Sequence, residues 1–157
     1  MKKEKIFAGI LVILLIVATV SFAGEWKETE ISKHVPLPPR IEIIPPAADL
    51  PPEISAFSGR WESTYDNYNI DFILVVTKIS RDRKAKIIMG MSGGRTKDYT
   101  TAPAEVIPGP KSKLEFVSGG SHFSFEMQED LKTIKGTRHK RGSPVGIVTM
   151  TLDKIED

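Results

Sequence analysis

The feature that most constrains this chain is a series of short, strand-length segments that begins at residue 57 and continues to residue 154. They recur at intervals of roughly 10 to 12 residues, with turn-forming residues between them. Several segments, such as 84–91 and 123–127, alternate apolar with polar residues, as strands with one buried face do. No window shows a sustained helical period. The sequence therefore predicts an all-β fold, an antiparallel up-and-down barrel of about eight strands, because closure removes exposed strand edges.

The parity of the alternation predicts which side chains face the barrel interior, because alternate residues of a strand share a face. The segment 69–79 is apolar on both faces, so its inward side stays unassigned and both faces are expected to be covered. We expect a polar loop at 92–103, a short strand at 104–107, and a basic hairpin loop at 138–144. The expected inward residues are Trp61, Ala85, Ile87, Met89, Met91, Leu114, Phe116, Phe123, Phe125, Met127, Ile134, Val148, Met150 and Leu152, with Tyr65 near one end.

The first 23 residues have the pattern of a signal peptide. Lysines at positions 2, 3 and 5 precede an uninterrupted apolar run over residues 6–20, and Ser21 and Ala23 supply the small residues that signal peptidase reads. The sequence predicts cleavage after Ala23 and an exported protein, periplasmic or extracellular. The alternative is a membrane anchor formed by residues 6–23, since a span needs roughly 20 apolar residues.

Residues 24–56 form a connector that is first charged and then rich in proline. Proline fixes φ and restricts the preceding residue, so this segment is expected to be an extended arm. One interpretation is a stiff spacer. Ile41, Ile43 and Ile44 indicate two alternatives, because a plain spacer has no use for them: they lie against the outside of the barrel, or they begin a site for a partner. The predicted domain follows at residues 57–157.

Two short motifs resemble those of a known family. Gly59-Arg60-Trp61 in the first strand resembles the Gly-x-Trp signature of lipocalin-like, or calycin-like, barrels, and Ile134-Lys135-Gly136 is similar to a pattern in small secreted bacterial barrels. The resemblance covers residues 57–154. It implies that a basic residue of the last strand, here Lys154, covers the ring of Trp61. It also implies a small apolar ligand in the lumen. However, a barrel of about 100 residues is short for a roomy cavity, and its own side chains can fill an interior of eight strands.

The sequence offers no catalytic constellation, so we expect a protein that is not an enzyme. It has no cysteine, its three histidines lack metal-ligand spacing, and no serine nucleophile elbow is present. Neither a cofactor nor a metal site is predicted. The carboxylates at 126, 129 and 130 and His122 are interpreted as solvated surface residues.

The predicted function is binding of a small apolar or amphipathic ligand by a secreted barrel, or service as an interaction module. The alternative is an accessory domain that partners a separate exported hydrolase. Because the inward residues offer few polar groups, we expect the lower barrel to be filled and any ligand to lie shallowly at the mouth near Tyr65 and Tyr99. The candidate ligand-binding residues are Trp61, Tyr65, Met89, Tyr99, Phe116 and Phe123.

One basic cluster remains, formed by Lys132, Lys135 and residues 138–141. It is interpreted either as a solvated hairpin whose charges discourage edge pairing, or as a contact for an anionic glycan, a lipid head group or an acidic protein. The formal net charge of +2 and the lack of interleaved aromatic residues argue against a nucleic-acid partner. A membrane contact is expected only if the N-terminal segment is retained.

Overall fold

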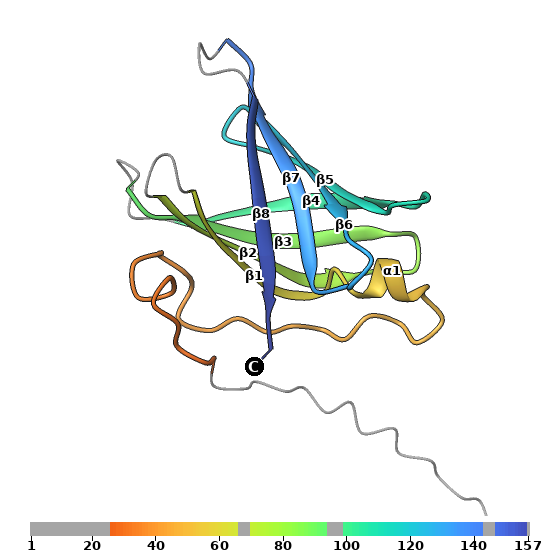
Figure 1. Cartoon of the computed structure of the whole chain (residues 1–157). Helices are drawn as coiled ribbons and strands as arrows, with labels where there is room; N and C mark the ends of the chain where they lie inside the picture. The colour runs from red at the N-terminus through yellow and green to blue at the C-terminus, as the bar shows by residue number, and fades with distance from the viewer. Residues whose placement is uncertain (1–25, 66–69, 94–98, 143–146, 157) are drawn as a thin grey trace, which may run out of the picture.

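The computed structural model describes residues 26–65, 70–93, 99–142 and 147–156. Eight strands form one closed antiparallel barrel, in which each strand pairs with the next along the chain and β8 pairs back with β1 (Figure 1). This confirms the predicted fold class. The elements are α1 (Pro52–Ser55), β1 (Gly59–Tyr65), β2 (Ile70–Ile79), β3 (Lys84–Met91), β4 (Thr100–Ile107), β5 (Lys113–Ser118), β6 (Ser121–Met127), β7 (Thr133–Lys140) and β8 (Ile147–Ile155).

The interior of the barrel is the hydrophobic core. The predicted inward residues belong to the main buried cluster, except Met91 and Val148, which are half-buried and pack against it, and Tyr65, whose side chain lies outside the described residues. The prediction from alternation is therefore confirmed. The inward side of β2, which the sequence left unassigned, is now clear. Phe72, Leu74 and Val76 belong to the same interior cluster, whereas Ile73 and Val75 are buried on the outer side.

Two predicted loops are shorter in the structure than expected. β4 begins at Thr100, so the stretch 100–103, expected as loop, pairs with β3. Pro103 lies within β4. Its missing N–H costs no hydrogen bond to β5, because the pairing of β4 with β5 starts only at Ala104. In the same way β7 extends to Lys140, and Arg138 is a strand residue rather than part of a hairpin loop.

The end of the barrel next to α1 is closed by apolar side chains. Ile54 of α1 and Phe57 after it are buried against the core. The indole N–H of Trp61 donates to the carbonyl oxygen of Phe57 at 2.8 Å, which joins this plug to β1. We call the opposite end, where β1, β3, β5 and β7 finish, the mouth.

Residues 26–50, here called the arm, run along the outside of the barrel before the chain enters α1 (Figure 1, orange). Val35 is buried with Ile73 and Val75, and Ile41 and Ile43 pack against the same cluster. Of the interpretations left open by the sequence, the structure shows the arm lying on the barrel wall rather than free as a spacer. The apolar outer face of β2 is thereby explained, because the arm covers it.

Residues 1–23, predicted to be a signal peptide or an anchor, lie outside the described residues. Over the described ranges, no helix has the length and apolar character needed to cross a membrane.

Candidate functional site

The barrel interior contains a cluster of four phenylalanine rings, Phe72, Phe116, Phe123 and Phe125. Phe116 and Phe123 stack most closely, with ring centroids 4.8 Å apart and planes inclined by 13°. The other recorded centroid separations lie between 6.1 and 6.4 Å. Offset parallel rings of this kind stabilise a core beyond their area burial.

Gly136 is required by this cluster. It lies on β7, opposite Phe125 of β6, and a Cβ atom at this position would lie 2.3 Å from Cδ1 of the Phe125 ring. The absence of a side chain lets the ring lie across the backbone of the neighbouring strand. The Ile134-Lys135-Gly136 motif thus has a physical role in this barrel, independent of any resemblance.

The predicted ligand-binding residues are divided by the structure. Met89, Phe116 and Phe123 are buried in the main core cluster. Trp61 also belongs to this cluster, but it lies at the α1 end beside Phe57. Tyr99 precedes β4 and is 42% exposed. The backbone of Tyr65 ends β1, and its side chain lies outside the described residues.

Lys154 covers Trp61, as the resemblance implied. Its ammonium lies 5.4 Å from the indole centroid and donates to the carbonyl oxygen of Ala56 at 2.9 Å. Burial lowers the pKa of Lys154 below its ordinary value; the charge of Glu156 opposes this effect and that of Lys132 adds to it. This cation therefore belongs to the closed end of the barrel.

Arg138 belongs to the predicted basic cluster, but its inward orientation was missed because the sequence interpretation assigned it to a loop. It lies opposite Phe123 on one side and Val148 on the other, so it shares the inward parity of Ile134 and Gly136. Its guanidinium carbon is 5.9 Å from the ring centroid of Phe123, and Nε donates to Ser121 Oγ at 3.2 Å. Counting in twos from Ile134 would have shown that Arg138 faces inward.

Hydroxyl groups accompany Arg138 at the mouth. Ser118 and Ser121 are register partners at the β5–β6 turn, and both are buried. Ser63 of β1, also buried, lies opposite Phe72. The apolar interior therefore ends in a polar rim built from three different parts of the sheet.

The predicted basic cluster is separated in space. Lys132 lies at the α1 end, where it pairs with Glu156 at 2.7 Å. Hydrogen bonding to Glu156, together with its charge, raises the pKa of Lys132. Lys135 is exposed on the outer face opposite Glu126, whereas Lys140 is exposed at the mouth end of β7. Of the predicted cluster, the part near the interior is Arg138.

Two histidines and a carboxylate lie near one another on the outer face of β5, β6 and β7. His122 lies opposite His139 on the neighbouring strand, and its Nε2 is 3.7 Å from Glu115. Within the part of the chain that the structure describes, no three such groups lie close enough to hold a metal ion. Both histidines are exposed, as expected for His122 from its parity.

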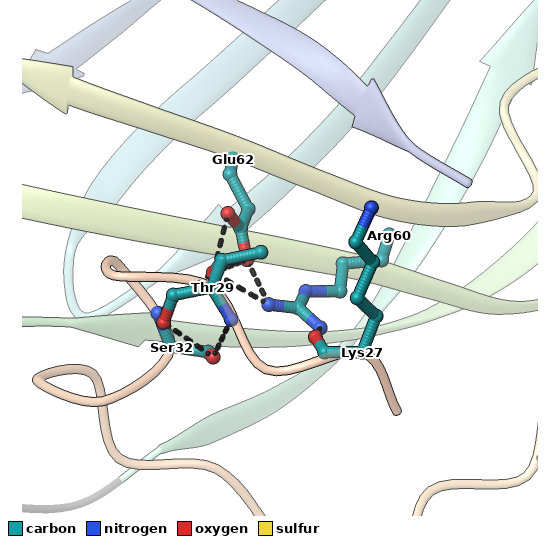
Figure 2. Close-up of polar contacts among 5 residues, drawn as sticks. All are labelled: Lys27, Thr29, Ser32, Arg60 and Glu62. Carbon is teal, nitrogen blue, oxygen red and sulfur yellow. Dashed lines mark hydrogen bonds and ion pairs between the residues drawn. The ribbon is translucent and has the colours of Figure 1, made fainter. Parts of the chain in front are cut away.

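A second polar cluster lies under the arm, on the outer face of β1. Arg60 and Glu62 form an ion pair whose side chains are 1% and 4% exposed. Figure 2 shows the arm closing over it: Arg60 Nη1 donates to the carbonyl oxygen of Lys27 at 2.8 Å, and Nη2 donates to Thr29 Oγ1 at 3.0 Å. The Thr29 hydroxyl in turn donates to the Glu62 carboxylate, with both oxygens at 2.9 Å.

A turn in the arm holds Thr29 in position to bind the Arg60–Glu62 pair. Ser32 Oγ donates to the Thr29 carbonyl oxygen at 3.0 Å, and the two residues exchange backbone-to-hydroxyl hydrogen bonds at 2.9 and 3.1 Å (Figure 2). Trp26 covers the guanidinium of Arg60, whose carbon is 5.1 Å from the ring centroid. Two charged groups that are removed from water need such hydrogen-bond partners, so this cluster holds the arm on the barrel wall.

In comparisons with known proteins, no family model, no curated protein and no solved structure matches this chain. The barrel architecture is consistent with a lipocalin-like fold, and the chain is assigned here to the closed eight-stranded antiparallel up-and-down barrels.

Proposed function

We propose that this protein is an exported, non-enzymatic, lipocalin-like barrel that binds a small apolar or amphipathic ligand at its mouth. The observation that carries the proposal is the change of character along the interior: stacked phenylalanine rings give way to inward-facing serines and Arg138. Ligand sites are commonly apolar surfaces with a few convergent polar groups. Cleavage after Ala23 remains the prediction from the signal sequence.

A shallow site is favoured over a deep one. Ile54, Phe57 and Trp61 occupy the closed end, and the four phenylalanine rings stack in the interior. Half-buried apolar side chains near the mouth, Met91 of β3 and Val148 of β8, are the ones that a ligand chain can reach with least rearrangement. We therefore retain the mouth as the site and assign Phe116 and Phe123 to its floor.

The interaction-module alternative has less support from the arm. Ile41 and Ile43 are already packed against the outer wall of their own barrel, so they are engaged within the chain. An accessory role beside an exported hydrolase would then have to use another surface. A small-molecule ligand requires no such surface.

The proposal is tested by titrating a neutral polarity-sensitive dye, N-phenyl-1-naphthylamine, into the mature protein and displacing it with dodecanol. We expect saturable binding that Val148→Trp blocks, because a large ring at this inward position occupies the mouth. Thr149→Trp is the matched control, since Thr149 is its exposed neighbour on β8. Thermal melts of both variants establish that they fold. An unsaturable signal, or equal loss in both folded variants, would overturn the proposal.

A further inference from the structure

We propose that the mouth of the barrel is built for the anionic head group of a single-chain amphiphile, held by Arg138 with Ser121. This inference rests on the proposed function and adds the chemical class of the ligand: an apolar chain that ends in a carboxylate or phosphate. The chain would lie over Phe123, and the anionic oxygens would meet the guanidinium.

The position of Arg138 is the first step. It faces the interior, is half-buried, and lies over the ring of Phe123 at 5.9 Å. Ser121, only 1% exposed, accepts from Nε and so fixes the plane of the guanidinium. Among the described residues, the hydrogen bond of this fork is made by Nε, which leaves the two terminal amino groups directed to an incoming anion.

The electrostatic balance is the second step. Arg60, which is fully buried, has a carboxylate, a hydroxyl and a carbonyl oxygen as partners. The contacts of Arg138 within the described residues are instead with Ser121 and Phe123, and none is with a carboxylate. A partly desolvated guanidinium beside aromatic rings gains most from an anionic partner that arrives with a ligand.

The surroundings of Arg138 are the third step. Lys140, two residues further along β7, lies opposite Ser121 and is exposed, and Arg141 follows it. These cations at one edge of the mouth raise the local concentration of anions. Beneath them the paired rings of Phe116 and Phe123 offer an apolar floor, which no free inorganic anion would need. Together the two features match an amphiphile better than a small ion.

The chemistry of the fork is the fourth step. A planar guanidinium with two terminal amino groups binds the oxygens of a carboxylate or phosphate in parallel, which an ammonium group does not do. Both head groups share this property, so the experiment includes one of each. A neutral alcohol of the same chain length shares the apolar term and lacks the charge.

The experiment measures dissociation constants of dodecanoate, dodecyl phosphate and dodecanol for the mature protein by calorimetry, below their micelle concentrations and at fixed ionic strength. We expect at least one anion to bind about tenfold or more tightly than dodecanol, the effect of a charge-assisted hydrogen-bonded pair. The tighter anion identifies the head group. If all three bind equally, the barrel binds chains but the head-group inference is overturned. If none binds, the proposed function fails as well.

Variants then assign the effect to Arg138. Arg138→Gln should remove the preference for the anion over dodecanol, because the charged fork is lost while the apolar floor of Phe116 and Phe123 remains. Arg138→Lys should recover only part of the preference, because charge is restored without the fork. Lys135→Gln is the matched control, as it removes one positive charge from the exposed face of the same strand. An anion preference that survives Arg138→Gln, or that Lys135→Gln removes equally, would refute the assignment.

Discussion

At the scale of single residues, the most demanding feature is the Arg60–Glu62 ion pair on the outer face of β1. Both side chains are almost fully buried, and the arm supplies Thr29, the Lys27 carbonyl oxygen and the Trp26 ring around them. Desolvation of two charges is costly and is offset only when the remaining hydrogen-bonding groups are satisfied. The pair therefore makes correct placement of the arm a condition for a stable native state.

The first prediction concerns the loss of one partner. Arg60→Ala or Glu62→Ala should each lower the free energy of unfolding by about 3–5 kcal/mol, because each leaves an uncompensated buried charge. Replacement of both by leucine should cost far less, since no charge is then buried. Urea unfolding of the mature protein measures these differences.

The matched control is Lys84→Ala, which breaks an ion pair with Glu105 at 2.8 Å in which both side chains are exposed. Water screens such a pair, so its loss should be much smaller than that of Arg60→Ala. Equal losses at the two sites would show that the arm does not bury the Arg60–Glu62 pair in solution.

At the scale of elements, the arm and β3 are shaped to fit each other. Gly90 of β3 faces outward beneath the arm, where a Cβ atom would lie 2.5 Å from the Pro36 carbonyl oxygen and 2.6 Å from Val35 Cγ1. A second contact lies where the register of β2 with β3 shifts, between Val76 and Lys78. There the backbone carbonyl oxygen of Thr77 accepts a hydrogen bond from the Ile44 N–H at 2.8 Å. The arm is thus fastened by close backbone approach as well as by the ion-pair cluster.

The second prediction is that Gly90→Ala loosens the arm. The added methyl group meets backbone at less than 3.0 Å, so the arm must shift and its amide groups become more accessible. Hydrogen exchange at Val35 and Ile44 should accelerate by tenfold or more, on the order of 1.4 kcal/mol.

Gly109→Ala is the control for this experiment, because a Cβ atom there would meet its nearest neighbour at 3.6 Å and the residue is exposed. Its exchange rates should match those of the native protein. Unchanged protection of the arm in Gly90→Ala would mean that the close approach at Gly90 does not hold the arm.

At the scale of the whole molecule, the barrel depends on closure between its first and last strands. β1 pairs with β2 along its full length, whereas residues 60–62 of β1 pair with 153–155 of β8. Trp61 and Lys154 are register partners in this short seam, and the Lys154 ammonium also reaches back to Ala56. Side-chain contacts therefore reinforce the join that has the shorter ladder.

The third prediction concerns the pH dependence of this seam. Burial lowers the pKa of Lys154 in the folded state below its ordinary value of 10.5, so the unfolded chain binds more protons between the two values. The contribution of Lys154 to stability should therefore increase as pH rises through the interval below 10.5. In Lys154→Met the methionine side chain does not titrate. The free energy of unfolding of the native protein should therefore increase relative to that of the variant as the pH rises.

Urea unfolding of both proteins from about pH 8 to about pH 11 provides the measurement, and the variant cancels the titration of other lysines. A difference that is constant with pH, or that moves in favour of the variant, would contradict the pKa direction assigned to Lys154.

The class of fold and most of the interior follow from local sequence patterns. Alternation is a local property, so the inward parity of segments such as 84–91 and 123–127 could be read without knowing the register. The Gly-x-Trp segment and Lys154 were joined correctly through a resemblance, and the structure places them in contact. Part of the candidate site was accessible in the same way, since Met89, Phe116 and Phe123 follow from parity alone.

The cover on the outside of the barrel and the residues at its mouth depend instead on long-range contacts. The arm meets β1, β2 and β3 through contacts between residues more than 30 positions apart, such as Thr29 with Glu62 of β1, and no local periodicity encodes them. Arg138 was misassigned because the basic run beside it resembles a solvated turn, whereas pairing with β6 and β8 extends β7 through it. Strand ends depend on the partner strands available, and the register that supplies those partners exists only once the barrel has closed.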